Sequence, residues 1–406
     1  GRVTSFAGAS TGSHGDMTTG ITMGAGNLDP RYRGMATDAY LYYYSIGSYP
    51  HISNAISNYT TRGVVVTSTS YSEGCNGGYT STTRGVDQQT RQYAAILHVF
   101  SAGNSATSNC GYGGGTHSGG LYYGNITGGR KQGKAVIATG NLDYRGVLTA
   151  SSSRGPAEDG RIKPDICSNG TNQMSTDPNN AYSPGGGTSA AAPGIAGLAV
   201  QMYDGYRQLN GGADPESALI KSAMLNTAHD IGNPGPDFFY GWGRVNANRA
   251  MELIEENRYL KSSVAQAGSN THTVNITSPL EQLKLMVYWT DYEGSTVSSQ
   301  DLVNNLDIKV IKPNGDTLLP WVLDPTPNGT SLSSNAVRGV DNLNNVEQVT
   351  IDTAVAGTYT ILVSGTTIPQ GPQDYYLLWE EISNEIEVTY PAGGEPFVPG
   401  EQETIR

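Results

Sequence analysis

Residues 185–200 read GGGTSAAAPGIAGLAV, and this stretch decides the fold. One serine, Ser189, stands behind three glycines and ahead of a run with helical spacing of its apolar residues. The spacing predicts a helix with one buried face, formed by Ile195, Leu198, Met202 and Tyr203. Ser189 would then lie at the helix N-terminus, where free N–H groups and the positive end of the dipole face it, and where Pro193 would fall in the first turn. A serine there is ordinarily a helix cap, so a nucleophile needs further evidence.

Partners for a reactive hydroxyl occur upstream. A serine hydroxyl needs a base to take its proton and a donor to hold the developing oxyanion. TGSHGDMTTG (11–20) offers His14 as the base, and VFSAGNS (99–105) offers Asn104 as the donor. Each block alone is weak evidence, but their order along the chain favours one catalytic set.

The spacing of apolar residues changes once along the chain and divides it into two parts. Up to about residue 254, short apolar runs such as 63–69 and 135–140 alternate with helical periods at 86–100, 215–228 and 245–256, which is typical of an α/β sheet with crossover helices. From about residue 264, alternating short runs and turns favour an antiparallel β-sandwich. We therefore expect domains at 1–256 and 264–386, a linker at 257–263, and a further linker or the start of another module at 387–406.

The blocks carry a family resemblance. HGDMTTG, SAGNS and GTSAAAPGIAG resemble the histidine, oxyanion-asparagine and serine blocks of the subtilisin-like serine peptidases, and SSSRGPAEDGRIKPDIC (151–167) resembles a fourth block of that family. The resemblance covers residues 1 to about 254 and implies a doubly wound, mostly parallel sheet. The tail, with LVNNLDIKVIKPNGD (302–316), is similar to the jelly-roll domain found behind the peptidase domain in some bacterial subtilases.

The resemblance assigns roles to residues. Ser189 would attack the peptide carbonyl, His14 would act as general base and then acid, and Asn104 would donate to the oxyanion. The residues expected to bind the polypeptide substrate are Ser68, Thr69, Ser70, Tyr71, Gly103, Gly187 and Thr188. An insertion before the nucleophile, TNQMSTDPNNAYSPGG (171–186), would help to shape the cleft. The chemistry requires no cofactor.

One member of the family's triad is missing. An aspartate should precede the histidine, yet residues 1–13 contain no Asp or Glu. Asp16 follows His14, and Asp165 matches a structural position, so neither replaces it. We expect an N-terminal fragment of the same precursor, cleaved but still bound, to supply the acid. The alternatives are a fragment that has lost this piece, or an inactive scaffold that binds peptides or acts in adhesion.

The composition limits the kinds of binding partner and the cellular compartment that we expect for this chain. A formal net charge of -12 argues against a nucleic-acid binder, which needs clustered cations. No apolar run reaches the roughly 20 residues of a membrane helix. Low charge density, many Gly, Asn, Ser and Tyr, and the resemblance together favour a secreted protein of bacterial type. A lipase is disfavoured because Ala191 stands where G-x-S-x-G requires glycine and because His14 precedes the serine.

The three cysteines lie in two kinds of sequence surroundings. Cys75 and Cys110 lie in Gly/Asn-rich loops and could pair in an oxidising compartment, whereas Cys167 has the setting of a buried apolar residue.

Subtilases often hold structural Ca²⁺. Asn305, Asp307 and Asp341 could supply oxygen ligands in the second domain, although Asn and Asp are also ordinary turn residues.

Overall fold

The computed structural model describes residues 2–5, 12–44, 51–72, 74–112, 116–117, 120–126 and 128–383, so the segment expected at 387–406 lies outside it. The N-terminal part contains the helices α1 (Ser13–Met23), α2 (His51–Arg62), α3 (Ser81–Gln92), α4 (Thr188–Leu209), α5 (Ser217–Asn226) and α6 (Ala247–Glu255), and the 3₁₀ turns η1 (Pro30–Tyr32) and η3 (Arg130–Gln132). Its strands are β1 (Val3–Ser5), β2 (Leu41–Tyr43), β3 (Val66–Thr69), β4 (Leu97–Ser101), β5 (Thr116–His117), β6 (Leu121–Tyr122), β7 (Ile137–Leu142), β8 (Ile166–Asn169), β9 (Gln173–Asp177) and β10 (Ala181–Gly185). The C-terminal part contains β11 (Tyr259–Val264), β12 (Ser269–Ile276), β13 (Leu280–Tyr288), β14 (Asn305–Ile311), β15 (Thr317–Leu318), β16 (Trp321–Val322), β17 (Val337–Arg338), β18 (Val346–Ala354), β19 (Gly357–Thr367), β20 (Gln373–Ile382) and the short helix α7 (Gly329–Leu332).

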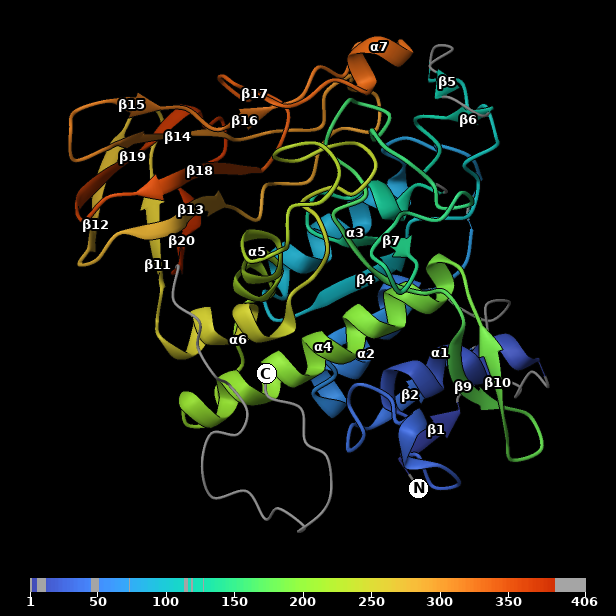
Figure 1. The fold of residues 1–406 in the computed structure, drawn as a ribbon. Coiled ribbons are helices and arrows are strands. Elements are labelled where there is room, and N and C mark those ends of the chain that lie inside the picture. Colours follow the sequence, from blue (N-terminus) through green and yellow to red (C-terminus); the bar gives the residue numbers. More distant parts are fainter. Residues whose placement is uncertain are drawn as a thin grey trace.

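A parallel sheet organises the N-terminal part. Its strands lie in the order β3-β4-β7-β8, while β1 and β2 form a separate parallel pair. Helix α4 packs across all four strands of the larger sheet (Figure 1). Its predicted apolar face is confirmed, because Ile195, Leu198, Met202 and Tyr203 are all buried. The predicted α/β class with a parallel sheet is therefore confirmed.

The prediction of a helix over 86–100 is wrong for the second half of that range. Helix α3 ends at Gln92, and β4 begins at Leu97. Every residue of β4 is buried, as in a parallel strand that is covered on both faces. A run that is apolar at nearly every position also satisfies helical spacing, so periodicity alone does not separate the two.

The C-terminal part is built from two antiparallel sheets, β11-β20-β13-β18 and β12-β19-β14-β15. Leu283, Leu285, Ile308 and Ile361 belong to the apolar core of this part. The linker expected at 257–263 is wrong: β11 starts at Tyr259, which pairs with Leu378 of β20. The β-rich domain therefore begins directly after α6.

Strand β13 is buried on both of its faces. Leu285 and Val287 lie in the core of the β-rich domain, whereas Met286 and Tyr288 belong to the core that contains α5. Alternate side chains of a strand point to opposite sides, so this strand packs against both parts at once. The two parts consequently share a continuous apolar interior.

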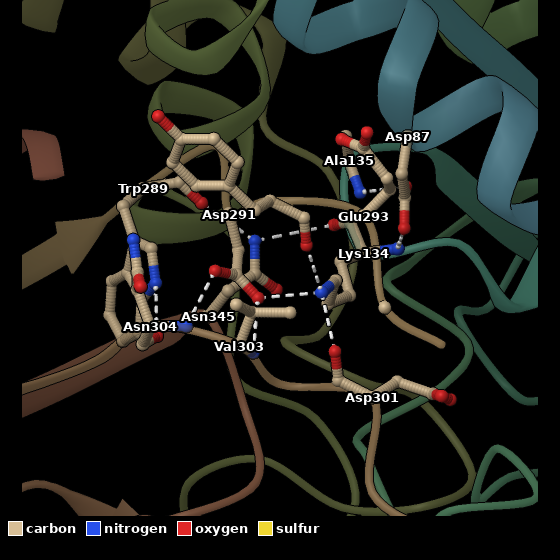
Figure 2. A network of polar contacts seen from close by, with 12 residues as sticks. Asp87, Lys134, Ala135, Trp289, Asp291, Glu293, Asp301, Val303, Asn304 and Asn345 are labelled. Atoms are coloured by element: carbon tan, nitrogen blue, oxygen red, sulfur yellow. Dashed lines mark hydrogen bonds and ion pairs between the residues drawn. The ribbon is translucent and has the colours of Figure 1, made fainter. Parts of the chain in front are cut away.

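A buried ion pair lies in the same interface (Figure 2). Lys134 Nζ donates to Asp291 Oδ2 and to the carbonyl oxygens of Tyr292 and Asp301, each at 2.6 Å. Both charged side chains are fully buried. Burial raises the pKa of Asp291, although the Lys134 ammonium and the backbone N–H groups of Val303 and Asn304 oppose that shift. One ammonium thus joins the N-terminal part to two segments of the β-rich domain.

Substituting this lysine should destabilise the whole chain. Lys134→Met leaves Asp291 buried without its cation, and the expected loss is about 3–5 kcal/mol of unfolding free energy. The measurement is denaturant unfolding of the full chain. The matched control is Lys312→Met, which removes a pair with the exposed Asp316 and should change stability far less. Equal effects of the two variants would contradict the structural role given to Lys134.

Two of the three cysteines form a disulfide, and the third is free. Cys75 and Cys110 form a disulfide, with Cα atoms 5.3 Å apart. Cys167 is a free, buried thiol, as expected. Burial raises the pKa of this thiol well above its usual value, so it stays protonated.

Candidate active site

Ser189 is the second residue of α4 and is half-buried. The preceding Gly187 has a φ of +92°, in the left-handed region that favours glycine. An added Cβ at Gly187 would lie 3.1 Å from Asn104 Nδ2. Glycine here therefore permits the turn into the helix and keeps the Asn104 amide uncovered.

Asn104 is fixed beside the start of α4. Its Oδ1 accepts from the backbone N–H of Thr188 at 3.0 Å and from the Thr188 hydroxyl at 3.1 Å. The Thr188 hydroxyl oxygen also accepts from the backbone N–H of Gly103 at 3.2 Å. Since the amide oxygen is occupied, the Nδ2 end is the group left to donate. Gly103, Asn104, Gly187, Thr188 and Ser189 thus form one cluster.

The segment expected to bind substrate is bonded to this cluster at a carbonyl that Pro193 leaves free. The expectation that it falls in the first helical turn is wrong, because it is the sixth residue of α4. A proline has no N–H, so the carbonyl four residues earlier, that of Ser189, lacks its intrahelical donor. The Ser70 hydroxyl donates to that carbonyl at 3.3 Å. The segment after β3 is thereby bonded to the residue expected to be the nucleophile.

His14 lines a cavity with the expected substrate-binding residues. It is the second residue of α1 and is exposed. The cavity measures about 410 Å³ and is lined by His14 together with Ser68, Thr69, Ser70 and Tyr71. Ser70 belongs to both groups, since it lines the cavity and bonds to Ser189. No hydrogen bond joins His14 to Ser189 within the described segments.

Helix α1 is held beside α4 and a hairpin. The Thr22 hydroxyl donates to the Pro193 carbonyl at 3.3 Å. Strands β9 and β10 form an antiparallel hairpin from the insertion that sequence placed before the nucleophile. Its Ser175 and Thr176 hydroxyls donate to the carbonyls of Met17 and Asp16, each at 2.7 Å. The insertion therefore packs next to His14.

Within the described segments, no carboxylate is hydrogen-bonded or ion-paired to His14. The Asp16 side chain is exposed. Asp165 is buried and paired with Lys163 and Lys221, as expected for a structural position. Burial alone would raise the pKa of Asp165, but the two ammonium groups hold it below its ordinary value.

Two strand edges face the cavity beside His14. The lining includes Leu41, Tyr42 and Tyr43 of β2 and residues 66–69 of β3. In the described part of the chain, β2 pairs on one side with β1, and β3 pairs on one side with β4. Both pairings are parallel. The cavity therefore separates two small parallel sheets.

Two further cations, which no sequence motif singled out, lie at the same end of the sheet. Arg130 Nη1 donates to the Tyr71 hydroxyl at 2.9 Å, and Lys131 Nζ lies 3.5 Å from Ser101 Oγ at the end of β4. Burial lowers the pKa of Lys131 to about 7. Their signal in the sequence was the pair of adjacent cations in GGRKQGK (128–134), after a long stretch without Lys, Arg, Asp or Glu.

The expected calcium ligands lie away from this site, in the β-rich domain. Asn305 and Asp307 are on β14, and Asp341 lies in the loop before β18. Across the described residues, no group of three or more His, Cys, Asp and Glu side chains could hold a metal ion. None of the described helices has the length and apolar character to cross a bilayer.

Comparison with known proteins gives a family match. The sequence model of the subtilase family matches residues 6–243. The serine protease/ABC transporter B family protein tagA of Dictyostelium discoideum is 27% identical over 263 residues, covering 55% of this chain and 15% of that protein. Subtilisin DY of Bacillus licheniformis is 28% identical over 207 residues, covering 51% of this chain and 64% of that protein. The chain thus spans less than two thirds of these curated relatives.

Two solved structures match this chain at low sequence identity. The patellamide maturation protease PatA is 18% identical, with a TM-score of 0.49, over 63% of this chain and 90% of that one. The prenylagaramide maturation protease PagA is 21% identical, with a TM-score of 0.49, over 62% of this chain and 85% of that one.

Proposed function

Since this chain belongs to the subtilase family of serine proteases, we propose that it is a secreted endopeptidase that hydrolyses peptide bonds through an acyl-enzyme on Ser189. The observation that carries the proposal is the placement of Asn104 beside Ser189, with its amide oxygen held by Thr188 and its Nδ2 left to donate. The disulfide between Cys75 and Cys110 supports an oxidising compartment, and hence secretion.

The proposed reaction uses three groups. His14 takes the proton from Ser189 Oγ as that oxygen attacks the substrate carbonyl carbon. The carbonyl oxygen becomes an oxyanion, to which Asn104 Nδ2 and a free N–H at the start of α4 donate. His14 then gives the proton to the leaving amine, and water releases the acyl group by the same path in reverse. These steps use side chains and backbone alone.

Substrate binding follows from the strand edge. Residues Ser68 to Tyr71, which form the end of β3 and the segment after it, line the same cavity as His14. An extended peptide can add to such an edge through main-chain hydrogen bonds, so recognition there depends little on side chains. The bond from Ser70 to the Ser189 carbonyl would keep this edge in register with the nucleophile.

The third triad member would come from an upstream segment that is cleaved from this chain and stays bound. Support comes from the cavity between β2 and β3, each of which is, among the described residues, an edge strand of its own parallel sheet. An extended segment between them would pair with both edges and would join the sheets into one. A carboxylate at its carboxyl end would then face His14, which lines the same cavity.

One observation favours a second candidate. No carboxylate in the described segments bonds to His14, so the chain by itself fits an inactive subtilase scaffold that binds peptides. A fluorophosphonate that reacts with activated serines distinguishes the two functions. The endopeptidase should gain one adduct at Ser189 by mass spectrometry, and the inactive scaffold should gain none.

Asn104→Ala should lower kcat on a peptide substrate by about 10²- to 10³-fold, with a much smaller change in KM. The physical reason is that the amide contacts the oxyanion in the transition state and makes little contact with the ground-state substrate. Steady-state kinetics measure both constants. The control is Asn210→Ala, at the exposed far end of α4, which should leave kcat unchanged. A rise in KM with kcat intact would contradict the role given to Asn104.

A further inference from the structure

Two aspartates meet where the N-terminal part touches the β-rich domain. Asp159 lies between β7 and β8, and Asp301 lies between β13 and β14. The backbone N–H of Asp301 donates to Asp159 Oδ2 at 3.3 Å. The side chain of Asp159 is only 1% exposed and that of Asp301 only 3%. These two residues, the carboxyl pair, therefore span the interface between the two parts and are almost completely buried.

Arg161 contacts both members of the carboxyl pair. Its Nε donates to Asp159 Oδ2 at 2.7 Å, whereas its Nη2 lies 3.5 Å from Asp301 Oδ2. The same Nη2 donates to the backbone carbonyl of Gln132 at 2.7 Å. The guanidinium is therefore bonded more closely to Asp159 than to Asp301.

The charges around the pair do not balance two ionised carboxylates. Lys134 Nζ forms its ion pair with Asp291 and reaches only the backbone carbonyl of Asp301 (Figure 2). Asp87 of α3 is buried nearby and accepts from the Tyr79 hydroxyl at 2.7 Å. The titratable and charged groups that face the pair are Tyr79, Asp87, Tyr112, Lys134, Glu158, Arg161 and Asp291. An unmatched negative charge in such a buried place is strongly unfavourable.

The hydrogen bonding of the pair also requires a proton. Asp159 Oδ1 and Asp301 Oδ1 are buried, and no described donor bonds to either. The two carboxyl groups lie within hydrogen-bonding reach of each other, but two ionised carboxylates can only accept. Burial and the negative charge of Asp159 raise the pKa of Asp301 to about 7, although Arg161 opposes that shift. Burial would also raise the pKa of Asp159, but Arg161 holds it below its ordinary value.

We propose that Asp159 and Asp301 share one proton across the interface, with Asp301 as the donor, and that the pair is a pH switch joining the two parts. With the proton in place, Asp301 donates to the Asp159 carboxylate and Arg161 balances the remaining charge. When the proton leaves, two buried carboxylates repel each other and the interface loosens. The switch is independent of the proposed peptidase chemistry.

The shared proton makes stability fall as the pH rises. In the unfolded chain the Asp301 carboxyl ionises at about pH 4, whereas in the folded chain it keeps its proton up to about pH 7. Between these values the folded chain binds one proton more than the unfolded chain, so its stability decreases with pH. Above about pH 7 both states have lost the proton, and the loss of stability is complete.

The test compares denaturant unfolding of the full chain and of an Asp301→Asn variant from about pH 5 to pH 9. Asparagine has nearly the same size and cannot ionise. One proton changes the unfolding constant by up to about 10-fold per pH unit. We expect the unfolding constant of the unmodified chain, divided by that of the variant, to rise to about pH 7 and then to stay level. The histidines titrate in both chains, so they do not change this ratio.

Hydrogen exchange locates the effect at the interface. The backbone N–H of Asp301 bonds to Asp159, and that of Val303 bonds to Asp291. The protection factors of these two N–H groups should fall above about pH 7 in the unmodified chain and stay constant in Asp301→Asn. Equal protection in the two chains on both sides of pH 7 would contradict a switch at this interface.

The control is Asp316→Asn, which alters an exposed carboxylate in the β14–β15 turn and should keep the pH dependence of the unmodified chain. If Asp301→Asn does not fold, Asp159→Asn replaces it. Asp301 then has Arg161 as its cation and should ionise at lower pH, so the same ratio should rise. Unfolding constants of the variant and the unmodified chain that run parallel over the whole pH range would overturn the proposal.

Discussion

Ser189→Ala should lower kcat on a peptide substrate by about 10⁶-fold, the magnitude known for the nucleophile of a subtilisin. Alanine keeps the start of α4, because the backbone of residue 189 still accepts from the Ser70 hydroxyl. The variant loses only the oxygen that forms the acyl-enzyme. Peptide hydrolysis and fluorophosphonate labelling measure the loss, and circular dichroism checks the fold.

A matched control uses the same substitution elsewhere. Ser298→Ala removes an exposed hydroxyl in the β-rich domain and should leave kcat unchanged. Residual activity of Ser189→Ala near that of the unmodified chain would mean that another group is the nucleophile. Absence of labelling in the unmodified chain would support the inactive scaffold instead.

An active preparation should contain a second polypeptide that carries an aspartate. An acid that orients the His14 imidazole and stabilises its charged form is worth about 10⁴-fold in turnover. Native and denaturing mass spectrometry would detect the partner beside the 42.9 kDa chain. Removing it should lower kcat by about 10⁴-fold, and adding it back should restore the activity.

The decisive control lies in the partner. If its aspartate is changed to asparagine, the complex should still assemble, because strand pairing uses the backbone, but kcat should stay low. A single 42.9 kDa species with full activity would contradict an acid supplied from another segment. A single species without activity would favour the peptide-binding scaffold.

Local patterns predicted much of the fold. The apolar face of α4 followed from spacing within one helix, because such spacing is set by helix geometry alone. The same reasoning failed for Leu97–Ser101, where a strand buried on both faces has no periodic signal to separate it from a helix. It also failed for Tyr259–Val264, whose pairing partner, β20, lies far along the chain.

The sequence predicted the candidate active-site residues but not the contacts that hold them in place. Sequence blocks identified His14, Asn104 and Ser189 as candidates. They did not reveal that Thr188 fixes the Asn104 amide, or that the missing N–H of Pro193 frees a carbonyl for Ser70. These are contacts between distant segments.

The double burial of β13 bears on how this chain could be recombined. Met286 and Tyr288 of that strand are part of the apolar interior that α5 also forms. The buried ammonium of Lys134 is paired there with the buried carboxylate of Asp291. A chimaera that grafts this peptidase domain onto a foreign β-sandwich would have to match an apolar strand face and a buried carboxylate together. Exchange of the two parts by gene fusion should therefore succeed only among chains that preserve both.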